Sequence, residues 1–171
     1  FEAMHTGHSV YATVHADTAN ETITRLTNPP INVPPNMLSN VHLNVIMFRD
    51  RKRGIRRVYQ VAEFMLGKEK IDANILYRWV PETDQIVPHN KSLSFFEALG
   101  RHTGMSEREI KQNIEDKKKI FEWVIKNKVT NLNSIGKIMN LYYTNHERLQ
   151  NIIKHNEVET IKEAKEIKEN L

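Results

Sequence analysis

Apolar and polar residues at the start of the chain follow patterns that predict a strand and then a helix. The run over 10–14 is β-branched and aromatic, which predicts a short buried strand. Residues 18–27 place Ile23 and Leu26 on one helical face. This helix must end before Pro29, because the residue that precedes a proline is driven out of the α region.

Two longer strands are predicted over 42–48 and 55–65, with a turn between them in which Gly54 supplies a positive φ angle. Their apolar positions suggest one buried face, formed by Val45, Met47, Val58 and Val61. The segments that follow predict a strand, a turn and a returning strand, over 74–80, 81–84 and 85–87. The sequence therefore indicates β-hairpins.

From residue 92 the period becomes helical, and four helices are predicted, over 92–102, 106–128, 133–143 and 147–171. Ser106 and Glu109 have the spacing of a capping box at the start of the second of these helices. Its core stripe is predicted to contain Ile110, Ile114, Ile120, Trp123, Val124 and Ile125. We expect an α/β part over 1–90 and an all-helical region over 91–171.

Composition limits the class of protein. The 171 residues are 39% hydrophobic and 27% charged, as in ordinary globular domains, and include no cysteine. Disulfides and thiolate metal ligands are thereby excluded. No apolar run approaches the roughly 18 residues of a membrane span, so we expect a cytoplasmic location. Residues 1–7 read as the last turns of a helix, and we expect the sequence to be a fragment of a longer protein.

Positive charge is concentrated in the predicted turn. Six of the seven basic residues among positions 1–60 lie within 49–57, and they include Arg56 and Arg57. Such a cluster attracts phosphates of a nucleotide, a nucleic acid or an anionic lipid surface. Only Phe48 adjoins it, so the base stacking of single-strand binding proteins is poorly supported. A simply solvated hairpin tip is the alternative.

His8 and His15 stand at the two ends of the predicted strand. A histidine near a γ-phosphate can donate a hydrogen bond to it, and its ordinary pKa of about 6.5 leaves its protonation adjustable. Two structural histidines at strand ends are the alternative. With Asp17 they are too few for a structural zinc site, and the other histidines are scattered, so we expect no metal site.

The string Thr6-Gly-His8, followed by the strand and Thr13-x-His15-Ala-Asp17, resembles the His box of type II/type IV secretion ATPases. Downstream, Asn28-Pro-Pro-Ile-Asn-Val-Pro34 resembles the archaeal branch of that family, which includes pilus and archaeal flagellar motor ATPases. Farther on, Tyr77-Arg-Trp79 and Phe121-Glu-Trp123 resemble its helical tail. The likeness is strongest over 1–65 and weaker after 145.

This resemblance implies the C-terminal half of a RecA-like P-loop ATPase core, containing strands and a basic β-hairpin, followed by an all-helical C-terminal region. It places His15 at the γ-phosphate, with His8 in support and Thr13 on the same strand. Arg56 and Arg57 become candidates for contacting a nucleotide of a neighbouring subunit. The longer protein would use ATP and Mg²⁺. It would form a hexamer, with a polytopic membrane platform protein as partner, at the inner face of the membrane and without nucleic acid.

Two motifs of that family are missing from the sequence. No Gly-x-x-x-x-Gly-Lys-Ser/Thr loop occurs, nor do the acidic residues that would hold Mg²⁺. Because these groups supply most of phosphoryl-transfer catalysis, we expect this chain alone to be inactive, without bound ATP or metal. Two other functions stay open. One is a non-enzymatic module that binds nucleic acid or a partner through 49–57, and the other is an assembly module that docks through 147–171.

Overall fold

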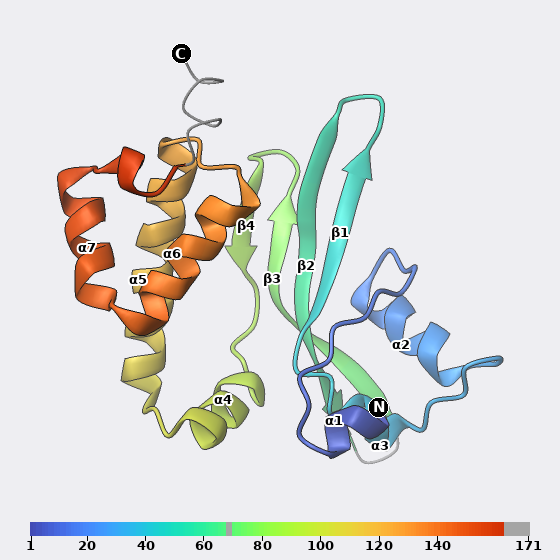
Figure 1. Cartoon of the computed structure of the whole chain (residues 1–171). Helices are drawn as coiled ribbons and strands as arrows, with labels where there is room; N and C mark the ends of the chain where they lie inside the picture. The colour runs from blue at the N-terminus through green and yellow to red at the C-terminus, as the bar shows by residue number, and fades with distance from the viewer. Residues whose placement is uncertain (68–69, 163–171) are drawn as a thin grey trace. The chain divides into compact units, whose positions relative to one another are not determined.

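The computed structural model describes residues 1–67 and 70–162 (Figure 1). By contacts the chain divides into two compact units, one from Phe1 to Met105 and one from Ser106 onward. The first is mixed α/β, and the second is helical throughout the described residues. The compositional division between residues 90 and 91 stays a prediction.

A four-stranded antiparallel sheet forms the first unit, with the strands in the order β1-β2-β3-β4 (Figure 1). Its strands are β1 (Asn44–Asp50), β2 (Ile55–Leu66), β3 (Ile71–Val80) and β4 (Gln85–Pro88). Both predicted hairpins are confirmed. In the first, Asp50 Oδ1 accepts hydrogen bonds from the backbone N–H groups of Lys52 and Arg53, and Gly54 has φ +68°. The side-chain hydrogen bonds and the positive φ angle stabilise the tight turn that joins the two antiparallel strands.

Four helices accompany the sheet in the first unit: α1 (Glu2–His5), α2 (Ala19–Thr27), α3 (Pro35–Leu38) and α4 (Phe95–Thr103). α2 begins as predicted, because the Thr18 hydroxyl accepts a hydrogen bond from the Glu21 amide. α4 ends at Gly104 with φ +71°, a left-handed C-cap. The core between helices and sheet contains Ala19, Ile23, Leu38, Ile46, Ala62, Phe64 and Ile71.

The prediction of the buried face of the first hairpin is wrong. Val45 and Met47 are 49% and 66% exposed, and Val58 and Val61, which pair with them, are half-buried. These four residues do lie together, but Ile46 on the opposite face of β1 is the one that is buried. Irregularities of register between Ile46 and Met47 and between Val61 and Ala62 interrupt the simple alternation on which the prediction relied.

The predicted buried strand over 10–14 is also absent. These residues have no regular secondary structure, and no described residue pairs with them in a backbone ladder. Tyr11 is 96% exposed, and Val10 and Val14 are each about 40% exposed. A strand needs a neighbour to satisfy its backbone groups, and the described part of this chain places none beside it.

The second unit contains α5 (Glu107–Lys126), α6 (Leu132–Thr144), α7 (His146–His155) and the short 3₁₀ helix η1 (Val158–Thr160). The capping box of Ser106 and Glu109 is confirmed, with both reciprocal hydrogen bonds formed. The predicted stripe of α5 is right at Ile110, Ile120, Trp123 and Val124, which are buried, and wrong at Ile114 and Ile125, which are exposed. The core of this unit adds Ile138, Leu149, Ile152 and Ile161.

The single helix predicted over 147–171 is wrong up to residue 162, and the rest of it lies outside the described residues. α7 ends at His155 because Asn156 adopts a left-handed conformation, with φ +53°. Its amide Oδ1 accepts a hydrogen bond from Trp123 Nε1, which ties the end of α7 to α5. Among the described helices, none has both the length and the apolar content that crossing a bilayer requires.

Candidate functional site

A groove of about 730 Å³ lies between the irregular segment 10–17, α2 and the start of β1. Apolar side chains form most of its wall, including those of Val10, Val14, Leu43 and Phe64. Polar groups reach it from the segment and from α2: Thr13, His15, Asp17, Glu21 and Arg25. The groove therefore combines an apolar wall with titratable groups at one rim, the usual character of a binding site.

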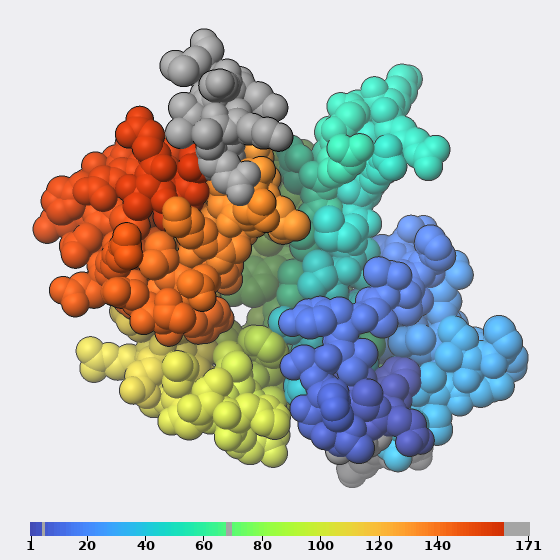
Figure 2. All heavy atoms as spheres, in the orientation of Figure 1, coloured from blue at the N-terminus to red at the C-terminus, as the bar shows by residue number. Residues whose placement is uncertain are grey.

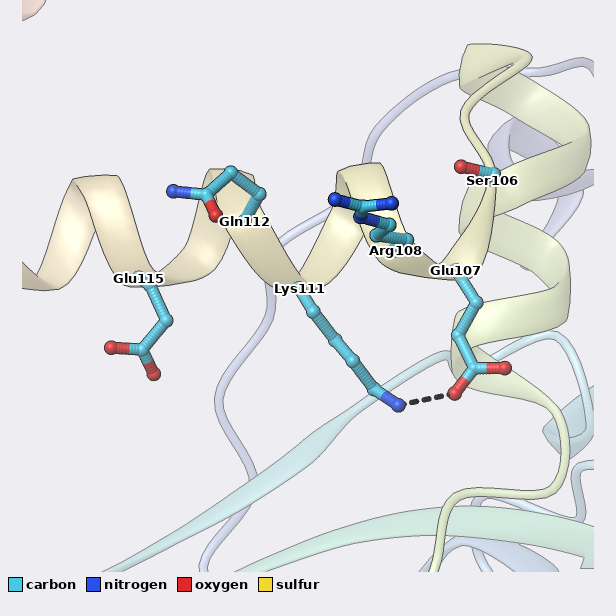
Figure 3. A pocket seen from close by; sticks show the side chains of 6 residues that line it. All are labelled: Ser106, Glu107, Arg108, Lys111, Gln112 and Glu115. Carbon is cyan, nitrogen blue, oxygen red and sulfur yellow. Dashed lines mark hydrogen bonds and ion pairs between the residues drawn. The ribbon is translucent and has the colours of Figure 1, made fainter.

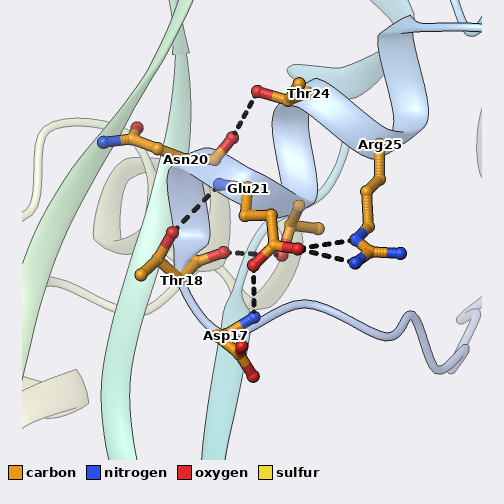
Figure 4. A network of polar contacts seen from close by, with 7 residues as sticks. Asp17, Thr18, Asn20, Glu21, Thr24 and Arg25 are labelled. Atoms are coloured by element: carbon orange, nitrogen blue, oxygen red, sulfur yellow. Dashed lines mark hydrogen bonds and ion pairs between the residues drawn. The ribbon is translucent and has the colours of Figure 1, made fainter.

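Glu21 organises the rim by fixing the end of the segment to α2 (Figure 4). Its Oε2 accepts a hydrogen bond from the Asp17 backbone N–H at 2.8 Å, and its Oε1 pairs with Arg25, whose Nε lies at 2.8 Å. The Asp17 amide and the Arg25 guanidinium lower the pKa of Glu21. Because both partners favour the carboxylate, Glu21 holds the segment while it is ionised.

Gln60 fixes the same helix from the sheet. Its side chain is buried, and its Oε1 accepts a hydrogen bond from the Ala19 backbone N–H at 3.1 Å. The first turn of a helix has amides without helical partners, and Gln60 and Thr18 each satisfy one of them. α2, and with it the end of the segment, is thus held to β2.

The structure brings two of the three predicted site residues to the groove. Thr13 and His15 line it and are exposed. His8 does not line it, and its Nδ1 instead lies 2.9 Å from the hydroxyl of Thr6, just after α1. The structure thus places His15 beside Thr13, while His8 has a local partner of its own.

Arg56 and Arg57 lie on β2, and neither lines the groove. The Arg57 guanidinium forms a bidentate ion pair with Asp84, with both N–O distances at 2.6 Å. Asp84 also accepts a hydrogen bond from Trp79 Nε1, and these donors lower its pKa to about 2. Arg56 is exposed, and no ion pair of it is found in the described part of the chain.

Glu63 is a second polar centre that the sequence reading missed. Its side chain is fully buried on β2, and its two oxygens accept six hydrogen bonds. The donors are Asn74 Nδ2, the hydroxyls of Ser92 and Ser94, and the backbone N–H groups of Leu93, Ser94 and Phe95. These bonds outweigh burial and lower its pKa to about 2. Glu63 anchors the start of α4. The only sequence signal was a lone acid within an apolar strand.

Charges along the groove are mixed. The Asp17 and Glu21 carboxylates oppose His15 and an Arg25 that is already paired, so the groove of this chain is no anion cradle by itself. Across residues 1–67 and 70–162, no group of three or more His, Asp or Glu side chains is placed to hold a metal ion. Asn44 Oδ1, at the groove wall, is buried without a hydrogen-bond partner among the described residues.

A surface hollow of about 660 Å³ lies along the first turns of α5 in the second unit (Figure 3). The six side chains that line it come from that helix and its N-cap Ser106, and two of them, Lys111 and Glu107, pair with each other. A hollow with one helix as its wall does not enclose a ligand, and we assign it no role.

Comparison with known proteins supports the resemblance over the first part of the chain. Residues 1–56 match the model of the family described as Type II/IV secretion system protein. This stretch contains His8, Thr13, His15 and α2, and its last residue is Arg56.

Three proteins of the archaeon Methanocaldococcus jannaschii are similar over more of the chain. "Uncharacterized protein MJ0900" is 29% identical over 153 residues, and "Uncharacterized protein MJ0781" is 28% identical over 142. "Uncharacterized protein MJ1287" is 29% identical over 133 residues. The alignments cover 84%, 80% and 75% of this chain, but only 27%, 20% and 49% of the three relatives. The chain thus spans half or less of their length.

Proposed function

We propose that this chain is the C-terminal part of a hexameric ATPase of the type II/IV secretion superfamily, from its archaeal branch. The longer protein couples ATP hydrolysis to assembly of a pilus or archaellum or to protein export, at the cytoplasmic face of the membrane. The observation that carries the proposal is the family match over 1–56, which contains the segment with Thr13 and His15. The similarity to much longer archaeal proteins agrees with it.

The geometry of the segment supports a role that needs further residues. Residues 10–14 are exposed and have no ladder partner among the described residues. In the proposed RecA-like core, a neighbouring strand pairs with 10–14 and covers Val10 and Val14. His15 then lies at the edge of a buried strand, where it donates a hydrogen bond to the γ-phosphate, with Thr13 beside it and His8 in support.

The residues of this chain fit ATP and Mg²⁺ only in part. ATP with Mg²⁺ supplies the transferred phosphoryl group and part of the charge neutralisation. His15 and Thr13 offer donors toward it, whereas Asp17 and Glu21 in the same groove repel phosphates. The phosphate-binding loop and the Mg²⁺ carboxylates must therefore come from other sequence, and the chain alone is proposed to be inactive. For contact with a neighbouring subunit's nucleotide, Arg56 is the better candidate, because Arg57 is held by Asp84.

The first test is the coding DNA immediately upstream of Phe1. We expect an in-frame Gly-x-x-x-x-Gly-Lys-Ser/Thr followed by an acidic strand end. The encoded protein, expressed from that frame, is expected to hydrolyse ATP, and His15→Ala to lower the rate about 100-fold or more. His89→Ala, which removes another exposed histidine of the same unit, is the matched control and is expected to leave the rate unchanged.

Three results would overturn the proposal or parts of it. A reading frame that opens at Phe1 removes the ATPase assignment. Equal activity of the His15→Ala and wild-type proteins removes the role of His15. ATP hydrolysis by the purified 171-residue chain, abolished by His15→Ala, contradicts the claim that the chain is inactive alone.

A further inference from the structure

The tip of the β1–β2 hairpin has five basic side chains: Arg49, Arg51, Lys52, Arg53 and Arg56. We call them the basic tip. Asp50 is the one acid within the tip; its Oδ1 caps the turn, and its Oδ2 lies 3.7 Å from Arg53 Nε. The other four have no ion pair within residues 1–67 and 70–162, and all five are exposed. Figure 2 shows the hairpin end, in teal, projecting from the surface of its unit. The cations thus surround a folded, protruding turn.

Arg49 and Arg56 are directly opposite each other in the strand register. They share one face of the hairpin, because residues paired across an antiparallel ladder point to the same side. Like charges at that spacing weaken a hairpin, and neither arginine forms an ion pair with an acid of the described residues. Such a pair is stabilised when an anionic group contacts both guanidinium groups.

Arg57, the next residue, gives the internal contrast. It pairs with Phe48 in the register, on the opposite face, and Asp84 neutralises it there. Phe48 on that face packs against Trp79 and Tyr59, with ring centroids 5.1 and 6.5 Å away. The aromatic ring beside the basic tip is therefore used in packing and is not free to stack on a nucleic-acid base.

Apolar surface adjoins the arginine pair on its own face. Met47, two residues before Arg49 on β1, is 66% exposed, and its register partner Val58 is half-buried. Lysines and arginines next to an exposed apolar side chain are suited to a membrane surface, where the cations contact headgroup phosphates and the apolar side chain reaches the hydrocarbon below them. From this placement we propose that the basic tip, with Met47, docks on an anionic phospholipid bilayer.

This inference rests on the membrane-peripheral location in the proposed function and assigns Arg56 to lipid phosphates in place of a neighbouring subunit's nucleotide. Its test is independent of ATP and of the rest of a longer protein. If vesicle binding fails, the ATPase proposal stands. If the ATPase proposal fails, the vesicle result is unaffected.

The test is sedimentation of the 171-residue chain with vesicles of phosphatidylcholine alone or mixed equally with phosphatidylglycerol. We expect binding to the anionic vesicles only, weakening as salt shortens the Debye length. Each basic residue near a charged surface contributes about fivefold to partitioning, so Arg49→Gln with Arg56→Gln should weaken binding about 25-fold. Lys118→Gln with Lys126→Gln removes the same charge from exposed positions of α5 and should change binding less than about twofold.

Met47→Gln tests the apolar contact. It should weaken binding about fivefold, by a factor that persists at high salt, since burial of apolar area is not screened. The arginine variants should keep the far-UV circular dichroism of the parent, because they remove a like-charge pair.

Four outcomes would overturn the proposal. The first is equal binding to neutral vesicles, and the second is full binding by the Arg49→Gln/Arg56→Gln variant. The third is displacement from vesicles by inorganic phosphate at constant ionic strength, which assigns the arginine pair to a free anion. The fourth is tighter binding to a single-stranded oligonucleotide than to vesicles, lost in the same variant, which assigns the tip to nucleic acid.

Discussion

Glu63 and residues 9–16, both in the first unit, differ in how far hydrogen bonds within the chain satisfy their polar groups. Glu63 is fully buried, and six hydrogen bonds occupy its oxygens. Within the segment, no backbone N–H of residues 9–16 donates to any described residue, and Tyr11 is almost fully exposed. The chain itself thus supplies the hydrogen-bond donors of the Glu63 carboxylate, whereas the backbone N–H groups of residues 9–16 lack acceptors among the described residues. Strong polar contacts thus mark the scaffold here, and missing contacts mark the candidate site.

The same contrast separates the two neighbouring arginines of β2. Arg57 forms an ion pair with Asp84, 27 residues away along the chain, whereas Arg56 forms no ion pair in the described structure. A short ion pair at an exposed position contributes little to stability, but it removes a charge from the surface available to partners. Function is therefore better sought at Arg56 and Arg49 than at Arg57.

The largest effect is expected for Glu63→Ala. It leaves buried donors without an acceptor, and the free energy of unfolding of the first unit should fall by about 3–5 kcal/mol. Urea unfolding followed by Trp79 fluorescence, with Trp123→Phe in every variant, measures this unit. Glu97→Ala, an exposed acid of α4, is the control and should shift stability by less than about 0.5 kcal/mol. Equal losses in the two variants would show that Glu63 is no anchor.

Acid should reproduce part of that loss. The pKa of Glu63 is lowered from 4.5 to about 2 in the folded chain, so its contribution is present above the unfolded pKa. It is lost as the pH falls from about 4.5 towards 2, and amounts to about 3 kcal/mol at neutral pH. Unfolding of the first unit measured at several pH values should show this decline, and Glu63→Gln should flatten it. A decline equally steep in Glu63→Gln would assign it to other acids.

Local signals were enough to predict much of the fold. The Thr18 cap, the capping box at Ser106 and the glycine turn of the first hairpin all depend on residues within a few positions of each other. The same holds for the C-cap at Gly104, two residues beyond the predicted end of that helix. Such features are determined by short-range hydrogen bonds and backbone preference, and the sequence shows both directly.

The features that the sequence did not show depend on residues far apart along the chain. Five of the hydrogen bonds of Glu63 come from residues 29 to 32 positions downstream. The buried face of β1 and β2 depends on register irregularities that no residue pattern announced. Residues 10–14 have the composition of a strand, but strand formation requires a neighbour, and composition cannot supply one. The motif in the sequence identified the candidate site and the missing phosphate-binding loop, whereas only the structure showed that residues 10–14 have no ladder partner among the described residues.

A smaller loss of stability is expected when the hydrogen bond that links α2 to β2 is removed. Gln60→Leu removes the acceptor of the Ala19 amide and should lower the stability of the first unit by about 1–3 kcal/mol. Amide exchange within α2 should accelerate as well, because the helix loses its link to β2. Gln85→Leu, at an exposed position of β4, is the matched control. Unchanged exchange in α2 would mean that the Thr18 cap alone holds the helix.

The smallest effect is expected in the segment itself. Tyr11→Ala should change the free energy of unfolding by less than about 0.5 kcal/mol, because the ring is 96% exposed. Phe64 at the groove wall is 2% exposed, so Phe64→Ala should lower the free energy of unfolding by about 3–5 kcal/mol. Hydrogen exchange should find the amides of 9–16 unprotected in this chain and those of β2 protected. If a longer protein from the same reading frame protects 9–16 and makes Tyr11→Ala destabilising, the segment has gained the neighbour it lacks here. Protection of 9–16 in the 171-residue chain would contradict the contrast with Glu63.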